Sequence, residues 1–121
     1  MKALRILLVE DNTMIAWLLE EVLSGMGHDV CAVVATEAEA VAAAIRCGPN
    51  MMIVDVRLGE GSGVSAVDEI LRTRFVPHVF VSGDISTVRE LRPAAVVIQK
   101  PFRELDLARA MQRAAHAAPA S

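Results

Sequence analysis

The sequence contains no tyrosine, one tryptophan and only two cysteines. Cys31 and Cys47 lack the spacing of a metal or redox motif, so we interpret both as reduced thiols of a cytosolic protein, with a single disulfide as the alternative. No apolar run reaches the roughly 18 residues that a membrane span needs. The first residues, MKALRILLVEDN, meet two acids at once and lack a small-residue cleavage site, which argues against a signal peptide. We therefore expect a cytoplasmic protein that does not contact a membrane.

Basic residues are also too few for a nucleic-acid binder. The net charge is −3, whereas proteins that bind nucleic acids directly usually present a basic face. The 54% apolar and 22% charged residues are typical of a globular protein, and 121 residues suit one domain. We expect a single domain over residues 1–121, with an ordered core from about residue 4 to about residue 117.

Short apolar runs alternate with helical patterns along the chain. The patterns predict strands over residues 5–9, 29–35, 51–56, 78–82 and 94–99, and helices over residues 13–26, 36–46, 64–73, 85–91 and 102–117. Apolar strands separated by helices indicate a parallel sheet covered on both faces, and right-handed crossovers favour a doubly wound α/β fold. In such folds the functional crevice lies beyond the carboxyl ends of the strands.

Polar residues lie at the carboxyl ends of four of the five predicted strands. Glu10 and Asp11 follow the first strand, Asp55 lies near the end of the third, Ser82 ends the fourth and Lys100 follows the fifth. Taken singly, each has an ordinary explanation, such as a helix cap or a solvated lysine. Chance would rarely place all of them at the carboxyl ends of the right strands, so we interpret them as one site.

Three clustered carboxylates repel one another and raise each other's pKa values, and a divalent cation removes that cost. Oxygen ligands without a nearby histidine or cysteine pair suit Mg²⁺, with Mn²⁺ as an alternative. A magnesium ion, the ammonium of Lys100 and the hydroxyl of Ser82 could together surround a phosphoryl group on Asp55. An aspartate is a known nucleophile for phosphoryl groups, and their transfer depends mainly on positioning and charge neutralisation.

The sequence resembles a response-regulator receiver domain along essentially its whole length. The matching motifs are LLVEDN, MMIVDVRL, FVSG and QKPF. The resemblance implies a flavodoxin-like (βα)5 fold with a five-stranded parallel sheet of order 2-1-3-4-5. It also implies a two-component signalling domain rather than an enzyme, phosphorylated on Asp55 by a histidine kinase or a histidine phosphotransfer protein.

The resemblance further implies a set of site residues. Magnesium would be held, directly or through water, by Glu10, Asp11, Asp55 and the backbone carbonyl of Arg57. Asp11 outranks Glu10 as a direct ligand. Ser82 and Lys100 would contact the phosphoryl group, and a cis peptide bond would join Lys100 to Pro101.

The sequence departs from the family pattern near the fifth strand. Val97 stands three residues before Lys100, where many receivers carry an aromatic residue, so an inward swing of a ring cannot occur there. The segment between Ser82 and Lys100 looks short, and we expect the weakly apolar helix within it to be mobile. These features resemble a receiver branch with Phe-Ala-Thr-Gly at the end of strand four.

Two further positions could tune the lifetime of a phosphoaspartate. Arg57 lies two residues after Asp55, and Asp84 lies two residues after Ser82. We hypothesise that Arg57 and Asp84 form an ion pair that hinders attack by water. Two solvated side chains are an equal alternative, because exposed pairs contribute little. Trp17, which we expect to be partly exposed, could contribute to the surface that docks the phosphodonor.

Several functions compete for this sequence. The first is a stand-alone receiver that signals by protein–protein contact, or by onward phosphorelay, to an unknown target. A receiver segment of a hybrid histidine kinase or longer regulator is the main alternative, since AHAAPAS would suit a linker. A degenerate receiver that only binds is disfavoured by the intact motifs. A magnesium-dependent phosphatase would need a carboxylate where Arg57 stands, and a flavin carrier would need glycine and hydroxyl groups where EDN stands.

Overall fold

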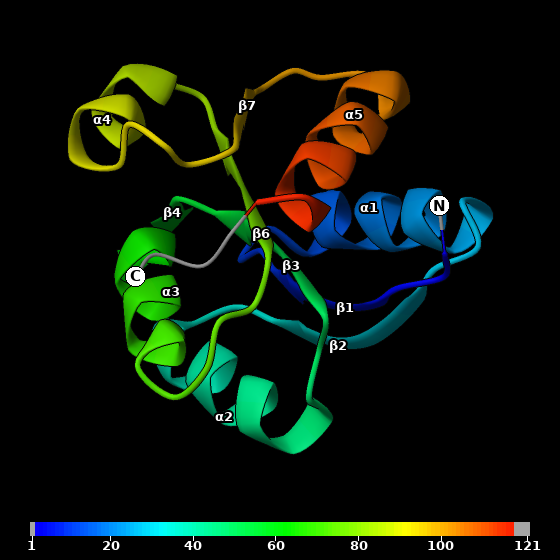
Figure 1. The fold of residues 1–121 in the computed structure, drawn as a ribbon, viewed down its shortest axis with the longest axis horizontal. Coiled ribbons are helices and arrows are strands. Elements are labelled where there is room, and N and C mark those ends of the chain that lie inside the picture. Colours follow the sequence, from blue (N-terminus) through cyan, green and yellow to red (C-terminus); the bar gives the residue numbers. More distant parts are fainter. Residues whose placement is uncertain (1, 118–121) are drawn as a thin grey trace.

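Five parallel strands form the central sheet of the computed structural model, which describes residues 2–117 (Figure 1). Most of the predicted linker, residues 118–121, lies outside the described residues, as does residue 1. The strands are β1 (Arg5–Val9), β2 (Asp29–Val34), β3 (Met51–Asp55), β6 (His78–Ser82) and β7 (Val97–Gln99). Their spatial order is β2-β1-β3-β6-β7, and all neighbours are parallel. Counted along the chain, this is the predicted order 2-1-3-4-5, so the flavodoxin-like α/β fold is confirmed.

Four helices lie between the strands of the sheet and a fifth follows β7, and together they cover both faces of the sheet. They are α1 (Thr13–Gly25), α2 (Glu37–Cys47), α3 (Gly63–Leu71), α4 (Ile85–Leu91) and α5 (Glu104–Ala115). Helices α1 and α5 lie together on one face, and α2 and α3 on the other (Figure 1). Alternate strand residues point to opposite faces and so serve two cores. On β1, Ile6 and Leu8 pack with α1 and α5, whereas Leu7 and Val9 pack with α2 and α3.

A small antiparallel hairpin, which the sequence did not predict, follows the end of β3. Its strands are β4 (Arg57–Leu58) and β5 (Gly61–Ser62), and Ser62 accepts hydrogen bonds from the first amides of α3. The hairpin fixes the loop that leaves Asp55. None of the helices within residues 2–117 is long and apolar enough to cross a bilayer.

Two elements begin two or three residues later than predicted, and the other bounds agree with the prediction to within two residues. Strand β7 begins at Val97 rather than at residue 94, and α5 begins at Glu104 rather than at residue 102. The Arg103 backbone N–H donates to the carboxylate of Asp106 at 2.9 Å, which is the geometry of a helix start. The predicted helix over residues 85–91 is present as α4, and among its residues the buried one is Val88.

Candidate functional site

The predicted site residues meet at the carboxyl edge of the sheet. Glu10, Asp55 and Ser82 are buried, with 4%, 6% and 7% of their surfaces exposed. Asp11 remains exposed and Lys100 is half-buried. Carboxylate oxygens of Glu10, Asp11 and Asp55 lie within 4.8 Å of one another. The edge of the sheet therefore concentrates three acidic groups in one place.

Both carboxylate oxygens of Asp55 accept hydrogen bonds. The backbone N–H of Arg57 donates to Oδ1 at 3.0 Å, and Nζ of Lys100 donates to Oδ2 at 2.8 Å. The same Nζ lies 3.5 Å from Oε1 of Glu10. The Lys100–Pro101 peptide bond is cis, the geometry that the resemblance implied. A single ammonium group thus lies between two buried carboxylates and compensates part of their charge.

The electrostatics of the cluster are dominated by burial. The pKa of Glu10 is raised to about 7, first by burial and then by Asp55, while the Asn12 backbone N–H and Lys100 act to lower it. Burial acts to lower the pKa of Lys100, but the hydrogen bond and charge of Asp55, together with Glu10, outweigh burial and raise it. Lys100 therefore stays protonated at neutral pH. Its single positive charge does not bring the pKa of Glu10 back to the ordinary value of a glutamate.

The donor set fits a hard divalent cation. The converging side chains offer carboxylate oxygens alone, which Mg²⁺ prefers. The backbone N–H of Gly59 donates a hydrogen bond of 2.8 Å to Oδ2 of Asp11 and so fixes the position of this carboxylate. The Arg57 backbone adjoins the cluster, since its N–H binds Asp55. A cation bound among these groups would supply the positive charge that Lys100 alone does not.

Ser82 lies at this edge, but its hydroxyl is engaged in its own turn. Oγ donates to the backbone carbonyl of Asp84 at 2.9 Å and accepts from the Asp84 N–H at 3.1 Å. A hydroxyl has one proton to donate. Contact with a phosphoryl group would therefore require the Ser82 proton to leave the carbonyl of Asp84.

The hypothesised ion pair between Arg57 and Asp84 is not formed in the structure. The Asp84 carboxylate instead caps α4, where its Oδ1 accepts from the backbone N–H of Ser86 at 3.1 Å and from the Ser86 hydroxyl at 2.6 Å. The pKa of Asp84 is lowered, first by the Ser86 side chain, then by its backbone N–H and to a smaller extent by the charge of Arg57. The capping bonds hold the carboxylate on α4, and the effect of both residues on phosphoryl lifetime stays a prediction.

Trp17 lines a hollow beside the acidic cluster. Glu10, Asp11, Glu20 and Val33 contribute to the same hollow. Trp17 is 59% exposed, in line with the expected partial exposure. This indole is therefore accessible from solvent and close to the acidic groups.

Gly63 is a site-supporting residue that the motif analysis missed. A Cβ atom at this position would lie 2.1 Å from the backbone oxygen of Asp55 and 2.6 Å from Cγ1 of Val54. The Gly63 N–H also donates to the carbonyl of Val56 at 2.8 Å. Only glycine lets α3 begin this close to the end of β3. The glycine-rich run GEGSG was the sequence signal for such a close approach.

The acidic cluster lies at the carboxyl ends of the strands, where doubly wound α/β folds place their functional crevice. The family model for the response regulator receiver domain matches residues 6–112. The chain belongs to this family, whose members are signalling modules of two-component systems.

Relatives found by sequence and by structure support the assignment to this family. The chain is 34% identical over 116 residues to the phyllosphere-induced regulator PhyR of Methylorubrum extorquens, which covers 93% of the chain and 43% of that regulator. It thus spans less than half the length of that relative. The receiver domain of PhyR from Erythrobacter litoralis has a TM-score of 0.86 at 27% identity, covering 98% of this chain and 97% of that one. The receiver domain of the sensor histidine kinase PA1611 from Pseudomonas aeruginosa, solved with a magnesium ion in its active-site cleft, has a TM-score of 0.81 at 28% identity, covering 96% and 100%.

Proposed function

We propose that Asp55 accepts a phosphoryl group from the phosphohistidine of a histidine kinase or a histidine phosphotransfer protein. The observation that carries the proposal is the buried Asp55 carboxylate, held on both oxygens and adjoined by the carboxylates of Glu10 and Asp11. One Asp55 oxygen attacks phosphorus while the phosphorus–nitrogen bond breaks. The electron pair of that bond returns to the imidazole, which then takes up a proton from solvent.

The residues around Asp55 have distinct roles in this proposal. Lys100 orients the carboxylate before transfer and neutralises a phosphoryl oxygen after it. The Arg57 N–H fixes the other carboxylate oxygen, and the Ser82 hydroxyl can donate to the phosphoryl group once it leaves its turn. Water attack on the phosphoaspartate later releases inorganic phosphate and restores the carboxylate.

The proposal includes magnesium dependence. Glu10, Asp11, Asp55 and the Arg57 carbonyl would hold Mg²⁺, or Mn²⁺, which supplies positive charge for the transferring phosphoryl oxygens. The oxygen-only donor set supports this proposal, as does the raised pKa of Glu10. The magnesium ion in the cleft of the PA1611 receiver domain is a parallel in a relative.

The phosphorylated domain would pass its signal to a downstream protein by contact, or hand the phosphoryl group onward. The proposal places this reaction in the cytoplasm, where kinases have access to ATP, in a single receiver domain over residues 1–121. Both a stand-alone receiver and a receiver segment of a longer regulator or hybrid kinase are compatible with this chemistry.

Intact-mass analysis with acetyl phosphate as the phosphodonor tests the proposal. We expect wild type to gain one phosphoryl mass in the presence of Mg²⁺ and to gain none when EDTA removes the metal. Asp55→Asn should abolish the gain, whereas Asp29→Asn, which changes an exposed aspartate on β2, should not. Labelling that persists in Asp55→Asn would contradict the assignment. Wild type that is not labelled by acetyl phosphate or by a phosphohistidine donor would favour a degenerate, binding-only receiver.

A further inference from the structure

Cys31 and Cys47 lie side by side, although they are 16 residues apart in the chain. Cys31 belongs to β2 and Cys47 is the last residue of α2, and both are free thiols. The Cys47 thiol donates to the backbone carbonyl of Cys31, with Sγ 3.5 Å from the oxygen, and the two thiols are within hydrogen-bonding reach of each other. Both residues are half-buried, so the pair is partly accessible from solvent.

An irregularity in the pairing of β1 with β2 sets the position of Cys31. Ile6 of β1 pairs with Val30. The next residue of β1, Leu7, pairs with Ala32, so Cys31 is an extra residue without a partner on β1. Val30 packs in the core of α1 and α5, whereas Ala32 packs in the core of α2 and α3. Such β-bulges are rare between parallel strands and re-aim side chains, and this one occurs where Cys31 meets the end of α2.

The surroundings of the two thiols differ. Burial and then the neighbouring Cys47 thiol raise the pKa of Cys31 to about 11, although the charge of Arg5 acts to lower it. Cys31 therefore stays protonated at neutral pH and is not the thiol that reacts first, because the thiolate is the nucleophile. Arg5 also holds the other half of the pair, since its Nε donates to the backbone carbonyl of Cys47 at 2.7 Å.

We propose that Cys31 and Cys47 are a redox-active pair that hydrogen peroxide converts to an intramolecular disulfide. Sγ of Cys47 attacks one peroxide oxygen, the oxygen–oxygen bond breaks, and the departing oxygen takes up the thiol proton and leaves as water. Sγ of Cys31 then attacks the sulfur of the resulting sulfenic acid, whose hydroxyl leaves with the Cys31 proton as a second water. Two thiols thus lose two electrons to one peroxide, and a dithiol reductant such as dithiothreitol returns them.

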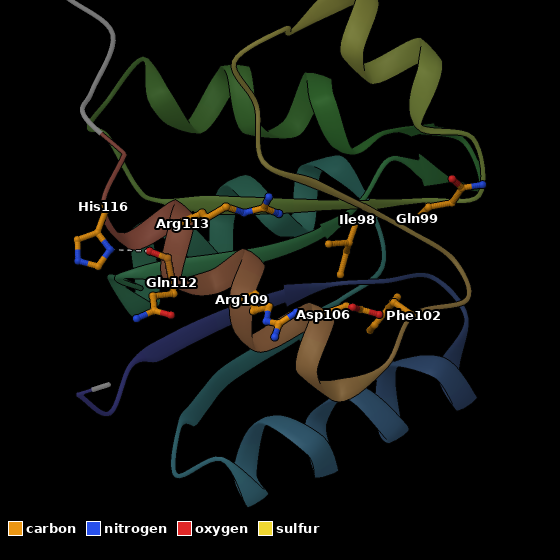
Figure 2. A pocket seen from close by; sticks show the side chains of 8 residues that line it. All are labelled: Ile98, Gln99, Phe102, Asp106, Arg109, Gln112, Arg113 and His116. Atoms are coloured by element: carbon orange, nitrogen blue, oxygen red, sulfur yellow. Dashed lines mark hydrogen bonds between the residues drawn. The ribbon is translucent and has the colours of Figure 1, made fainter.

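The disulfide would join the edge strand β2 to the end of α2. Within the described sheet β2 pairs with β1 alone, and none of its six residues is fully buried. A covalent link between the strand and the helix restricts the unfolded chain and so stabilises the oxidised fold. The groove between β7 and α5, whose lining Figure 2 shows, lies at the other end of the sheet. The pair is therefore a site of its own, and its oxidation does not depend on phosphorylation of Asp55.

Peptide mapping without reduction tests the proposal. Trypsin cleaves after Arg46, between the two cysteines, and releases residues 6–46 and 47–57 as separate peptides. After treatment of the folded protein with hydrogen peroxide and alkylation of the remaining thiols, we expect the two peptides as one linked species that dithiothreitol separates. Oxidation of methionines changes the masses of the peptides but cannot link them.

Alanine variants assign the two steps and the effect on stability. Cys31→Ala should stop at the sulfenic acid of Cys47, which dimedone traps, whereas Cys47→Ala should give little dimedone adduct. The same peroxide treatment should raise the urea midpoint of wild type, relative to that of C31A/C47A, by on the order of 1 M. The double variant is the matched control, because its methionines are oxidised in the same way.

Three other outcomes would overturn the proposal. Two unmodified thiols at a peroxide dose that oxidises free cysteine would show that the pair only packs. Linked peptides found only in covalent dimers on non-reducing gels would show a disulfide between two copies. Equal dimedone labelling of Cys31→Ala and Cys47→Ala would remove the order of the steps. The corresponding serine variants replace any alanine variant that circular dichroism shows to be unfolded. Asp55→Asn should form the disulfide like wild type, so a failure of phosphorylation leaves this result separate.

Discussion

The centre of the sheet and its β7 edge are built differently, although the site draws on both. All five residues of β3 are buried, and the strand pairs with β1 on one side and β6 on the other. Strand β7 has three residues, pairs only with β6 within the described sheet, and lies beside the seven-residue helix α4. Extensive burial fixes Asp55 in place, whereas β7 has a partner on one side only and is held by fewer backbone hydrogen bonds.

The hydrogen bond between Lys100 and Asp55 joins these two regions. Lys100 follows the edge strand, Asp55 ends the central strand, and their side chains are 2.8 Å apart. A change of charge at Asp55 would therefore act directly on Lys100, at the end of the edge strand. Val97 is buried where many receivers carry an aromatic ring, so no ring is present at this position to swing inward. The comparison shows that the Asp55 carboxylate and the edge strand belong to differently packed parts of the sheet, and that the Lys100–Asp55 ion pair joins them.

Removing that link should have the largest effect. Lys100→Ala is expected to slow phosphorylation of Asp55 by acetyl phosphate about 100- to 1000-fold, because a preorganised cation beside the reacting group is lost. Initial rates from intact-mass analysis measure the effect. Lys2→Ala, which changes the only other lysine of the chain, is the matched control and should react like wild type. A rate for Lys100→Ala within a few-fold of wild type would break the comparison, since the edge would then be dispensable.

A substitution at Gly63 tests how tightly helix α3 packs against the end of the central strand β3. Gly63→Ala should lower the free energy of unfolding by about 3 kcal/mol, because the new methyl group collides with the backbone of Asp55 and forces a shift in the packed centre. Urea unfolding measures this loss. Gly25→Ala places a methyl group at the end of α1, where nothing lies within 4 Å, and should be neutral or slightly stabilising. Equal stabilities of the two variants would show that the centre is less rigid than its burial indicates.

The charge at the centre predicts a pH dependence of stability. Glu10 has a pKa of about 7 in the folded protein, above its ordinary value of 4.5. Between these values the folded protein holds a proton that the unfolded chain has released, so the free energy of unfolding should fall as pH rises through this window. The expected loss in metal-free buffer is about 3 kcal/mol.

The comparison of wild type with Glu10→Gln isolates this contribution. Burial lowers the pKa of His78, which adds an opposite slope, but that slope is common to both proteins. The fall should therefore be present in wild type and absent from Glu10→Gln in chemical unfolding at several pH values. Added Mg²⁺ should flatten the wild-type curve, because a bound cation stabilises the ionised carboxylates. Identical curves for both proteins would contradict the raised pKa.

The smallest effects are expected at the edge. Arg57→Ala and Asp84→Ala should shorten the lifetime of the phosphoaspartate by at most about fivefold, because exposed charge pairs contribute little. Asp84→Ala should also speed hydrogen exchange in α4, since it removes the cap that binds Ser86. Arg57→Ala should leave exchange in α4 unchanged and so serves as the control. Lifetimes equal to wild type in both variants would discard the tuning hypothesis.

The sheet could be predicted from the sequence, but the smaller elements could not. Each central strand is an apolar run of several residues, and such runs carry a recognisable pattern. The hairpin of β4 and β5 has two residues in each strand, too few for any alternation. Residues 94–96 are apolar, yet they are used to return the chain from α4 to the sheet, so β7 begins at Val97. Both misses are cases in which connection geometry outweighs side-chain pattern.

The members of the site could also be selected from sequence, but their environments could not. Glu10 and Asp11 are neighbours in the chain, yet the first is buried and the second exposed. The Ser82 hydroxyl faces its own turn rather than the acidic cluster. These differences depend on the local path of the backbone after each strand. The sequence therefore predicts which groups meet, and the structure decides how each is protonated and hydrogen-bonded.

The position of Trp17 gives the protein a built-in optical reporter. Because the chain has no tyrosine, its near-ultraviolet fluorescence arises almost entirely from this one indole. The ring lines the same hollow as Glu10 and Asp11, so a charge that arrives at these carboxylates alters the electric field around the fluorophore. Metal binding and phosphorylation should therefore change the emission of the unlabelled protein, in real time and without a dye.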